Sequence, residues 1–177
     1  MKNLLTIIFL AVFTMNAAIA STNPVKIDPP TIVGVAAGNE DFSILVAAVK
    51  AADLVSVLNS DGPFTVFAPL NSAFGKLPKG TVATLLRAEN KETLTAILTY
   101  HVVSGKFMAS DVVAAIKKND GSFTIPTVQG GELVASLRDG NVILTDVAGN
   151  VSTIVMTDVA ASNGVIHAID SVVMPTK

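Results

Sequence analysis

The residues of this chain that could perform nucleophilic catalysis are few. The sequence has two histidines and no cysteine, so a thiolate nucleophile is excluded and a Ser-His-Asp arrangement is the hydrolytic chemistry left to consider. Its candidate members are Ser104, Ser162, His101, His167, Asp158 and Asp170. No serine stands in the Gly-x-Ser-x-Gly turn of the α/β-hydrolases, and both histidines continue apolar stretches. We therefore expect no enzymatic activity.

Metal and phosphate sites have equally little support in the sequence. Neither histidine has a second His or a Cys at ligand spacing. Gly130-Gly131 lacks the longer pattern and the lysine of a phosphate-binding loop. The adjacent carboxylates Glu40 and Asp41 precede a predicted helix, where capping accounts for them. We expect no metal and no cofactor.

The N-terminus has the three parts of a secretory signal peptide. Lys2 gives a positive start, Leu4 to Phe13 is almost wholly apolar, and Ala18-Ile19-Ala20 is the small-x-small pattern before a cleavage site. The apolar run is about half the ~20 residues that cross a bilayer, and no later stretch is long and apolar enough to do so. We predict that residues 1–20 are removed and that the protein is exported to a bacterial periplasm or beyond it.

Size and charge restrict the mature protein further. Removing 20 of 177 residues leaves 157, which suffice for one hydrophobic core and not for two. The whole chain has 12 basic and 14 acidic residues, a net charge of −2, and no basic run. A nucleic-acid-binding protein needs a clustered positive surface, so this class of partner is excluded.

Helical periodicity begins at Thr31, after a proline-rich lead-in at residues 21–30, and continues for about 85 residues. Phe42, Leu45 and Val49 recur at i, i+3 and i+7, and Asp41 stands where an N-cap is expected. Four more helices are predicted: 54–58, 82–86 capped by Thr81, 94–98 capped by Asn90, and 112–116 opened by Ser110 and Asp111.

The C-terminal third has the pattern of a β-sheet. Short β-branched runs separated by turn residues predict strands at 123–128, 133–137, 142–146, 151–156 and 165–173. Asp139-Gly140 is a strong signal for a two-residue hairpin. A further strand, 64–68, lies within the helical half, so distant segments must pair. The predicted fold class is α+β in one domain.

Three segments together resemble the fasciclin (FAS1) domain family. They are Thr65 to Phe74 (TVFAPLNSAF), Tyr100 to Val103 (YHVV) and Asn163 to Asp170 (NGVIHAID). They match, in order, the family's first box, its central Tyr-His pair and its second box. The resemblance covers residues 31–175. It implies a helical N-terminal half packed on a twisted β-sandwich or wedge formed by the C-terminal half.

Most box residues have a structural explanation. Those to which we assign one are Thr65, Phe67, Pro69, Asn71, Phe74, Asn163, Gly164, His167 and Asp170. Apolar residues on both sides of strand 64–68 predict burial between layers, and Pro69 ends that strand. Asn71 or Ser72 is expected to cap the turn that follows. Asn163-Gly164 is expected to supply a turn that tolerates positive φ.

The resemblance also implies partner contacts. In animal relatives the region of the Tyr-His pair is implicated in integrin binding, which carries over to Tyr100 and His101. Asp158 matches the acid of an Asp-Ile integrin motif, although Val159 replaces its isoleucine. From the residues themselves, the expected state of His101 is a core histidine with one satisfied hydrogen bond.

The function implied by the resemblance is adhesion without catalysis. The expected partner is a protein or glycan of a cell surface or extracellular matrix, with self-association as a way to strengthen weak single contacts. The alternative is a periplasmic binder of a small apolar ligand, held between the helical layer and the sheet.

Overall fold

The computed structural model describes residues 30–175. The predicted signal peptide and residues 21–29 of the predicted lead-in lie outside the described residues. The helices are α1 (Ile32–Ala37), α2 (Ser43–Ala51), α3 (Val55–Leu58), α4 (Asn71–Gly75), α5 (Thr81–Leu85), α6 (Lys91–Tyr100) and α7 (Ala109–Lys118), with 3-10 turns η1 (Glu40–Phe42) and η2 (Ala88–Asn90). The strands are β1 (Phe64–Pro69), β2 (Val102–Ser104), β3 (Ser122–Pro126), β4 (Glu132–Arg138), β5 (Asn141–Thr145), β6 (Val151–Ala161) and β7 (Gly164–Ile169).

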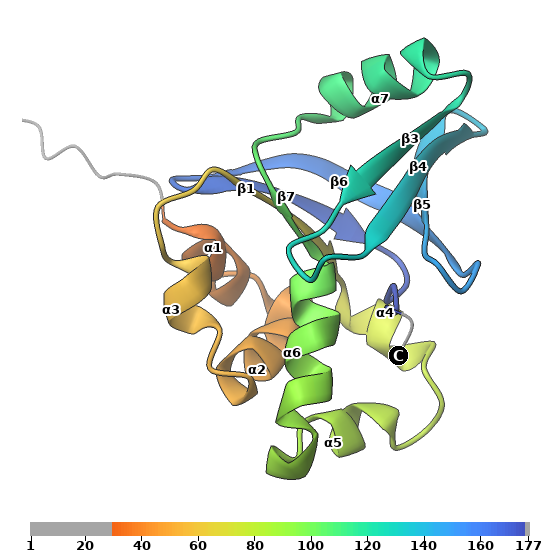
Figure 1. Ribbon diagram of the computed structural model, residues 1–177. Helices are drawn as coiled ribbons and strands as arrows, with labels where there is room; N and C mark the ends of the chain where they lie inside the picture. Colours follow the sequence, from red (N-terminus) through yellow and green to blue (C-terminus); the bar gives the residue numbers. More distant parts are fainter. Residues whose placement is uncertain (1–29, 176–177) are drawn as a thin grey trace, which may run out of the picture.

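The strands form a single mixed sheet in the order β2-β1-β7-β6-β5-β4-β3. Strands β1 and β7 pair in parallel, from Phe64 opposite Gly164 to Pro69 opposite Ile169, and the other neighbours pair antiparallel. The sheet curls until its two ends approach each other. This is shown by the hydrogen bond that the Val128 amide, just after β3, donates to the Val102 carbonyl oxygen of β2 at 2.8 Å. Helices α1 to α6 gather on one side of β1 and β7, and α7 lies on the other (Figure 1).

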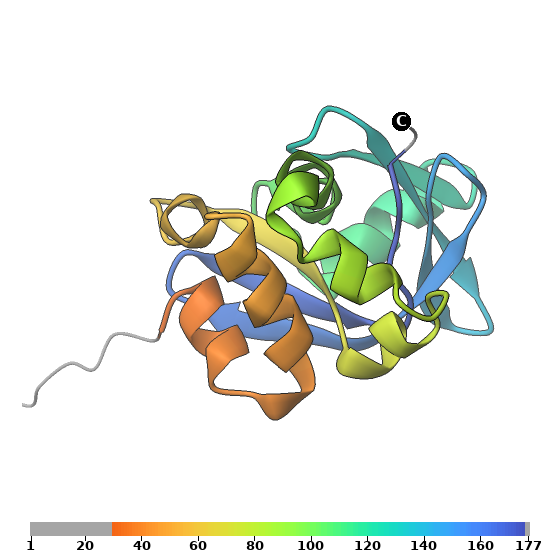
Figure 2. The same cartoon turned by 90° about the horizontal axis from the view of Figure 1, so that it is seen from below.

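Two apolar clusters occupy the two faces of this sheet. Val66 and Ala68 of β1 face the cluster formed with α1, α2 and α6. Phe67 and, from β7, Ile169 face the cluster that includes α7 and the inner side of β3 to β5. The predicted burial of strand 64–68 between two layers is therefore confirmed. Seen from below, the helices cover the β1–β7 region and leave β4 and β5 uncovered at the side (Figure 2).

The sheet differs from the sequence prediction in three strands. Strand β7 ends at Ile169, whereas the prediction ran to residue 173. The helical half supplies two strands, β1 and β2, where the sequence indicated one. Strand β6 continues to Ala161 through irregular pairing on either side of Met156, and Asp158 adopts φ 59°. The prediction stopped at residue 156 because Thr157 and Asp158 interrupt the apolar alternation that marks a strand. The Asp139-Gly140 hairpin is confirmed, with positive φ at both residues.

Several predicted caps are wrong. Asn39, rather than Asp41, caps the helix start, by accepting from the Asp41 amide at 2.9 Å. Asn90 precedes α6 but donates to the Thr84 carbonyl oxygen instead of capping.

Asn71 does not cap its own turn either. Its side chain accepts from the Ile44 amide at 3.0 Å and donates to the Glu40 carbonyl oxygen at 2.9 Å. It therefore fastens the start of α2 to the end of β1, a contact between segments about 30 residues apart that local sequence does not reveal.

Gly164 is required by close packing, and the predicted positive φ at Asn163-Gly164 is wrong, since neither residue has one. A Cβ on Gly164 would lie 2.1 Å from the Phe64 carbonyl oxygen. Gly164→Ala must therefore push β1 from β7, and we expect it to lower the free energy of unfolding by roughly 1–3 kcal/mol. Urea denaturation followed by circular dichroism measures this change.

Gly75→Ala is the matched control, since a Cβ there meets nothing within 4 Å. We expect it to change stability by less than about 0.5 kcal/mol. Equal losses in the two variants would contradict the role assigned to Gly164.

Candidate functional site

Tyr100 is fully buried at the end of α6. Its hydroxyl donates to the Glu132 carbonyl oxygen at 2.5 Å, which ties α6 to the start of β4. Burial raises the pKa of the phenol. Gly131 leaves room for the ring, since a Cβ there would lie 2.8 Å from the Tyr100 Cε2. The side chain holds two distant elements together and presents nothing to solvent.

His101 follows directly and is only 2% exposed. Its Nδ1 lies 2.7 Å from the Ile97 carbonyl oxygen, and its Nε2 lies 3.3 Å from the Val173 amide. Because the amide must donate, Nε2 accepts and Nδ1 carries the proton. The expected core histidine is confirmed, with two bonds in place of one. Burial lowers the pKa of His101 to about 4, so the ring is neutral at physiological pH.

Asp158 and His167 act together in the structure. The Asp158 carboxylate accepts from the Ala109 amide, the first of α7, at 2.8 Å. The Asp158 amide donates to the His167 Nδ1 at 3.3 Å, and the Nε2 of the same ring donates to the Phe107 carbonyl oxygen at 2.8 Å. His167 also stacks on Phe67, with ring centroids 5.8 Å apart. The pair fixes the chain that leads into α7.

Thr65 fastens the same segment from the other side. Its hydroxyl donates to the Gly105 carbonyl oxygen at 2.8 Å and accepts from the Phe107 amide at 2.9 Å. Thr65 belongs to the first box, and His167 to the second. Residues 105–109 are therefore held by both boxes and by Asp158. We call Thr65, Asp158 and His167 the α7 clamp.

Asn163 makes a second fastening point. Its amide nitrogen donates to the carbonyl oxygens of Leu58 and Ser60 at 2.7 and 3.0 Å, and its oxygen accepts from the Ile32 amide at 2.9 Å. One side chain thus joins α1, the end of α3 and the turn before β7. The sequence motif marked this residue, and the structure supplies the reason for its type, since only a carboxamide both donates and accepts here.

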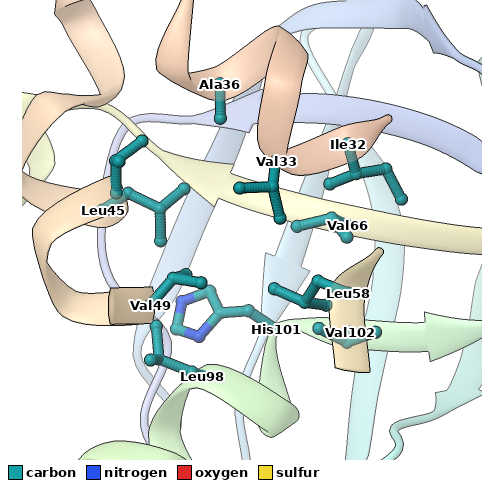
Figure 3. Close-up of a pocket in the computed structure, with 11 residues that line it drawn as sticks. Ile32, Val33, Ala36, Leu45, Val49, Leu58, Val66, Leu98, His101 and Val102 are labelled. Atoms are coloured by element: carbon teal, nitrogen blue, oxygen red, sulfur yellow. The ribbon is translucent and has the colours of Figure 1, made fainter. Parts of the chain in front are cut away.

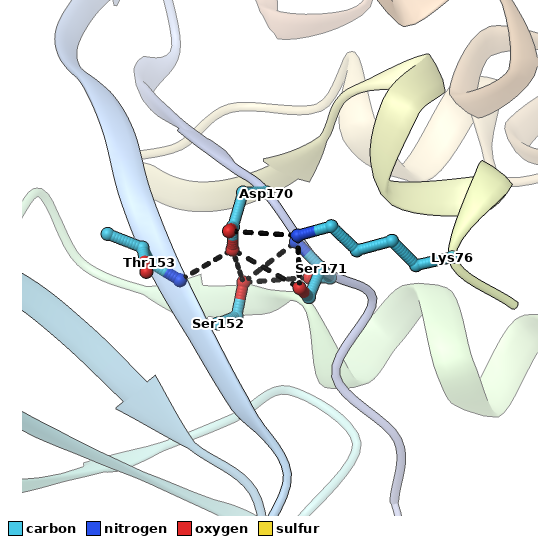
Figure 4. A network of polar contacts seen from close by, with 5 residues as sticks. All are labelled: Lys76, Ser152, Thr153, Asp170 and Ser171. Carbon is cyan, nitrogen blue, oxygen red and sulfur yellow. Dashed lines mark hydrogen bonds and ion pairs between the residues drawn. The ribbon is translucent and has the colours of Figure 1, made fainter.

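Asp170 lies at the centre of a polar network after β7 (Figure 4). Its carboxylate accepts from the Thr153 amide at 2.7 Å and from the Lys76 Nζ at 2.9 Å, with Ser152 and Ser171 beside it. Burial opposes ionisation, but the Thr153 amide and Lys76 outweigh it and hold the pKa of the carboxyl below its usual value. The network closes the end of β7 onto β6 and α4.

A catalytic triad does not form among the described residues. Ser104 and Ser162 are exposed, whereas both histidines are buried. All four imidazole nitrogens have backbone partners, so neither ring faces a serine as a base. Within residues 30–175, no three His, Asp or Glu side chains gather as metal ligands. In the same range, no helix has the length and apolarity to span a membrane.

Asp146 is a buried carboxylate that sequence analysis placed at a strand end without giving it a role. It is 5% exposed and accepts from the amides of Ala148, Asn150 and Met174 at 2.8–3.0 Å, and from the Asn150 side chain at 2.9 Å. It binds the β5–β6 turn to the C-terminal segment. The segment Asp146-Val147-Ala148-Gly149-Asn150 is the local signal that would have indicated such a turn.

A cavity of about 30 Å³ lies between the helices and β1. Figure 3 shows side chains of α1, α2, α3, β1 and α6 pointing into it, with the His101 ring at one side. The remaining wall is apolar: Ile32, Val33, Ala36, Leu45, Val46, Val49, Leu58, Val66, Leu98 and Val102. Both His101 nitrogens are engaged elsewhere, so this wall offers an entering molecule almost no hydrogen bonds.

The largest exposed apolar side chains of the sheet lie on β4 and β6. Val134 stands opposite Thr145, which stands opposite Val151. Val155 is 54% and Met156 44% exposed, at the irregular part of β6. These side chains lie on the same face of the sheet as the helices α1 to α6, beyond the area that those helices cover. We call Val134, Thr145, Val151, Val155 and Met156 the open sheet face.

Comparison with known proteins gives a consistent family likeness. A family model described as Fasciclin domain matches residues 40–175. Protein sll1483 of Synechocystis sp. is 52% identical over 145 residues, which are 82% of this chain and 73% of that protein. Immunogenic protein MPB70 of Mycobacterium bovis is 38% identical over 161 residues, 88% of this chain and 74% of that protein.

Larger proteins contain the same unit. Transforming growth factor-beta-induced protein ig-h3 of Sus scrofa is 35% identical over 149 residues, 83% of this chain but 20% of that protein. Among solved structures, a FAS1 domain pair from the insect cell adhesion molecule Fasciclin I matches with a TM-score of 0.72 and 20% identity, over 81% of this chain and 50% of that chain. At this identity the likeness shows the fold alone.

The buried state of His101 predicts a pH dependence of stability. The pKa of about 4 in the folded state lies below the ordinary 6.5, so the unfolded chain binds the extra proton. The contribution of the neutral ring to the free energy of unfolding is fully present above pH 6.5. It declines as the pH falls toward 4, by up to about 3 kcal/mol. Urea denaturation of wild type and His101→Gln at several pH values isolates this contribution, and parallel profiles would contradict it.

The α7 clamp predicts a second outcome. Asp158→Ala removes the acceptor for the Ala109 amide and places alanine at positive φ, so we expect a loss of about 1–2 kcal/mol in the free energy of unfolding. Asp158→Asn keeps an acceptor oxygen and a residue type that tolerates this backbone, so its loss should be below about 0.5 kcal/mol. Equal stability of Asp158→Ala and wild type in urea would show that the carboxylate holds nothing.

Proposed function

Since this chain belongs to the fasciclin domain family, we propose that it is an exported contact module that binds a cell-surface or extracellular-matrix partner through its open sheet face. Export follows from the predicted signal peptide at residues 1–20, to the periplasm or the outside of the cell. The observation that carries the proposal is an uncharged, partly apolar sheet surface that the helices leave uncovered. The suggestion of adhesion is supported by the insect cell adhesion molecule Fasciclin I, whose FAS1 domain pair shares the fold of this chain.

The open sheet face is suited to contact by its composition. The cross-strand row Val134-Thr145-Val151 carries no charge. The next row, Ser136-Ile143-Thr153, is uncharged too, but Ile143 is only 5% exposed, so this row adds little surface. The charged residues of β4 stand at its ends, Glu132 and Arg138. Contiguous apolar surface on a folded protein often marks an interaction site, and a surface without charges can be covered without burying an unpaired ion.

A protein partner fits this surface better than a glycan. Valine and methionine side chains gain from burial against other apolar side chains, whereas sugar hydroxyls need polar partners. One module presents a small interface, so firm attachment requires several copies. Self-association or display of many copies on a surface would supply them.

The family boxes have a different role in this proposal. Tyr100 and His101 are buried, and Asp158 is engaged with the start of α7. A partner that reached the Tyr-His pair would have to displace α6 or the loop at Gly131. We therefore assign these residues to the fold, while their contact role, implied by the family resemblance, stays a prediction.

The cavity favours a second function, the binding of a small apolar ligand. It lies where the alternative placed such a ligand, between the helical layer and the sheet. Apolar cavities stay dry and accept apolar molecules. This function does not compete for the same surface, because the open sheet face lies on other elements.

Attachment of protein-coated beads to bacterial cell envelopes and to extracellular matrix tests the contact function. We expect attachment to need folded protein and to rise steeply with the density of the protein on the bead. Val151→Glu places a charge in the open sheet face and should lower attachment at least about tenfold, since a buried unpaired charge costs several kcal/mol.

Val57→Glu is the matched control, because Val57 is a 50% exposed valine on α3. It should attach like wild type, and both variants should melt like wild type. Equal attachment by Val151→Glu and wild type, or attachment by heat-unfolded protein, would contradict the proposal.

A further inference from the structure

We propose that the cavity and the groove beside it bind an anionic amphiphile with a single acyl chain and a carboxylate head. The proposal rests on the second function above, the binding of a small apolar ligand, and names the class of that ligand. It is carried by the juxtaposition of an apolar cavity with a polar groove that contains Lys50. The two share Ala36 and Val46 as lining residues.

The cavity selects the end of a narrow chain. Its volume of about 30 Å³ is two to three times the ~10–15 Å³ that one water-sized sphere requires on the same measure. Compact drug-sized ligands need pockets of roughly 300 Å³ or more. A chain terminus meets aliphatic side chains on nearly every side, and the neutral His101 ring adds no charge.

The groove accepts the rest of the molecule. It has a volume of about 460 Å³ and runs between α1 and α2. Ala36, Ala37 and Val46 give it an apolar floor where it meets the cavity, and Asn39, Ser43 and Lys50 give it a polar margin. A chain that leaves the cavity past Ala36 and Val46 therefore passes from apolar to polar surroundings.

The head group is positioned by the periodicity of α2. Ser43, Val46 and Lys50 are spaced i, i+3 and i+7, which places them along one face of the helix. Ser43 and Lys50 are exposed on either side of Val46, at the mouth of the cavity. The Ser43 Oγ accepts from the Asn71 side chain at 2.9 Å, which leaves its own proton available for an anionic oxygen.

The charge of the groove favours a carboxylate at one end. Lys50 can pair with it there, whereas Glu40 stands ten residues earlier, in η1 and before α2 begins. A carboxylate next to Lys50 thus gains an ion pair. A cationic head would gain from Glu40 but would lie farther from Val46 and the cavity mouth.

Titration of the folded protein with decanoate and with decan-1-ol tests this proposal. Isothermal calorimetry measures the affinities, and amide chemical shifts in ¹⁵N spectra locate the site. We expect saturable decanoate binding with shifts at Ala36, Val46 and Val49, and an affinity about fivefold above that of decan-1-ol, as for an exposed ion pair.

Lys50→Gln should lower decanoate affinity about fivefold and leave decan-1-ol unchanged. Lys117→Gln is the matched control, since Lys117 is an exposed lysine of α7 on the other side of the sheet, and it should bind both probes like wild type. Ala36→Leu fills the junction of cavity and groove and should weaken both probes; thermal melting verifies that each variant is folded.

Three outcomes would overturn the proposal, and they differ in what they leave standing. Equal affinity for decanoate and decan-1-ol at this site would exclude recognition of the carboxylate head but leave the binding of an apolar ligand standing. Chemical-shift changes confined to β4 and β6 would place the amphiphile on the open sheet face and exclude the cavity and groove as its binding site. Absence of saturable binding by either probe removes both the amphiphile and the apolar-ligand function.

Discussion

The parallel pairing of β1 with β7 is the constraint on which the rest of the structure depends. It joins residues 64–69 to residues 164–169, about 100 positions later in the chain, and both strands are buried on their two faces. One face supports the helical layer and the other supports α7. The close approach of Gly164 to the Phe64 carbonyl oxygen fixes the register at the first pair. Strand β2 pairs with the other edge of β1 and β6 with the other edge of β7, and β5, β4 and β3 extend the sheet from β6.

Polar residues of the family boxes make this pairing specific. Thr65 and His167 fasten the entry to α7, and Asn163 fastens the helical layer to the turn before β7. The buried histidine and carboxylate side chains here have hydrogen-bond partners, as burial requires. Since these box residues hold the interior together, we propose that a binding function uses other surfaces: the uncovered part of the sheet, and the cavity with its groove.

Features set by local chemistry could be predicted from the sequence. The stripe of Phe42, Leu45 and Val49 and the Asp139-Gly140 hairpin depend on periodicity and turn geometry. Features set by distant partners could not. Asn71 caps a helix about 30 residues earlier, and β2 is too short to show alternation. The boxes led to the right family, whereas the open sheet face and the cavity arise when separate elements meet.

The central claim is that contact with a partner uses the open sheet face and not the family boxes. Hydrogen–deuterium exchange on protein attached to cell envelopes, compared with free folded protein, tests it most directly. The account predicts slower exchange across β4, β5 and the first part of β6, with unchanged exchange at the Tyr100-His101 segment. Protection confined to residues 100–103 and the Gly131 loop, with none on β4 to β6, would contradict it.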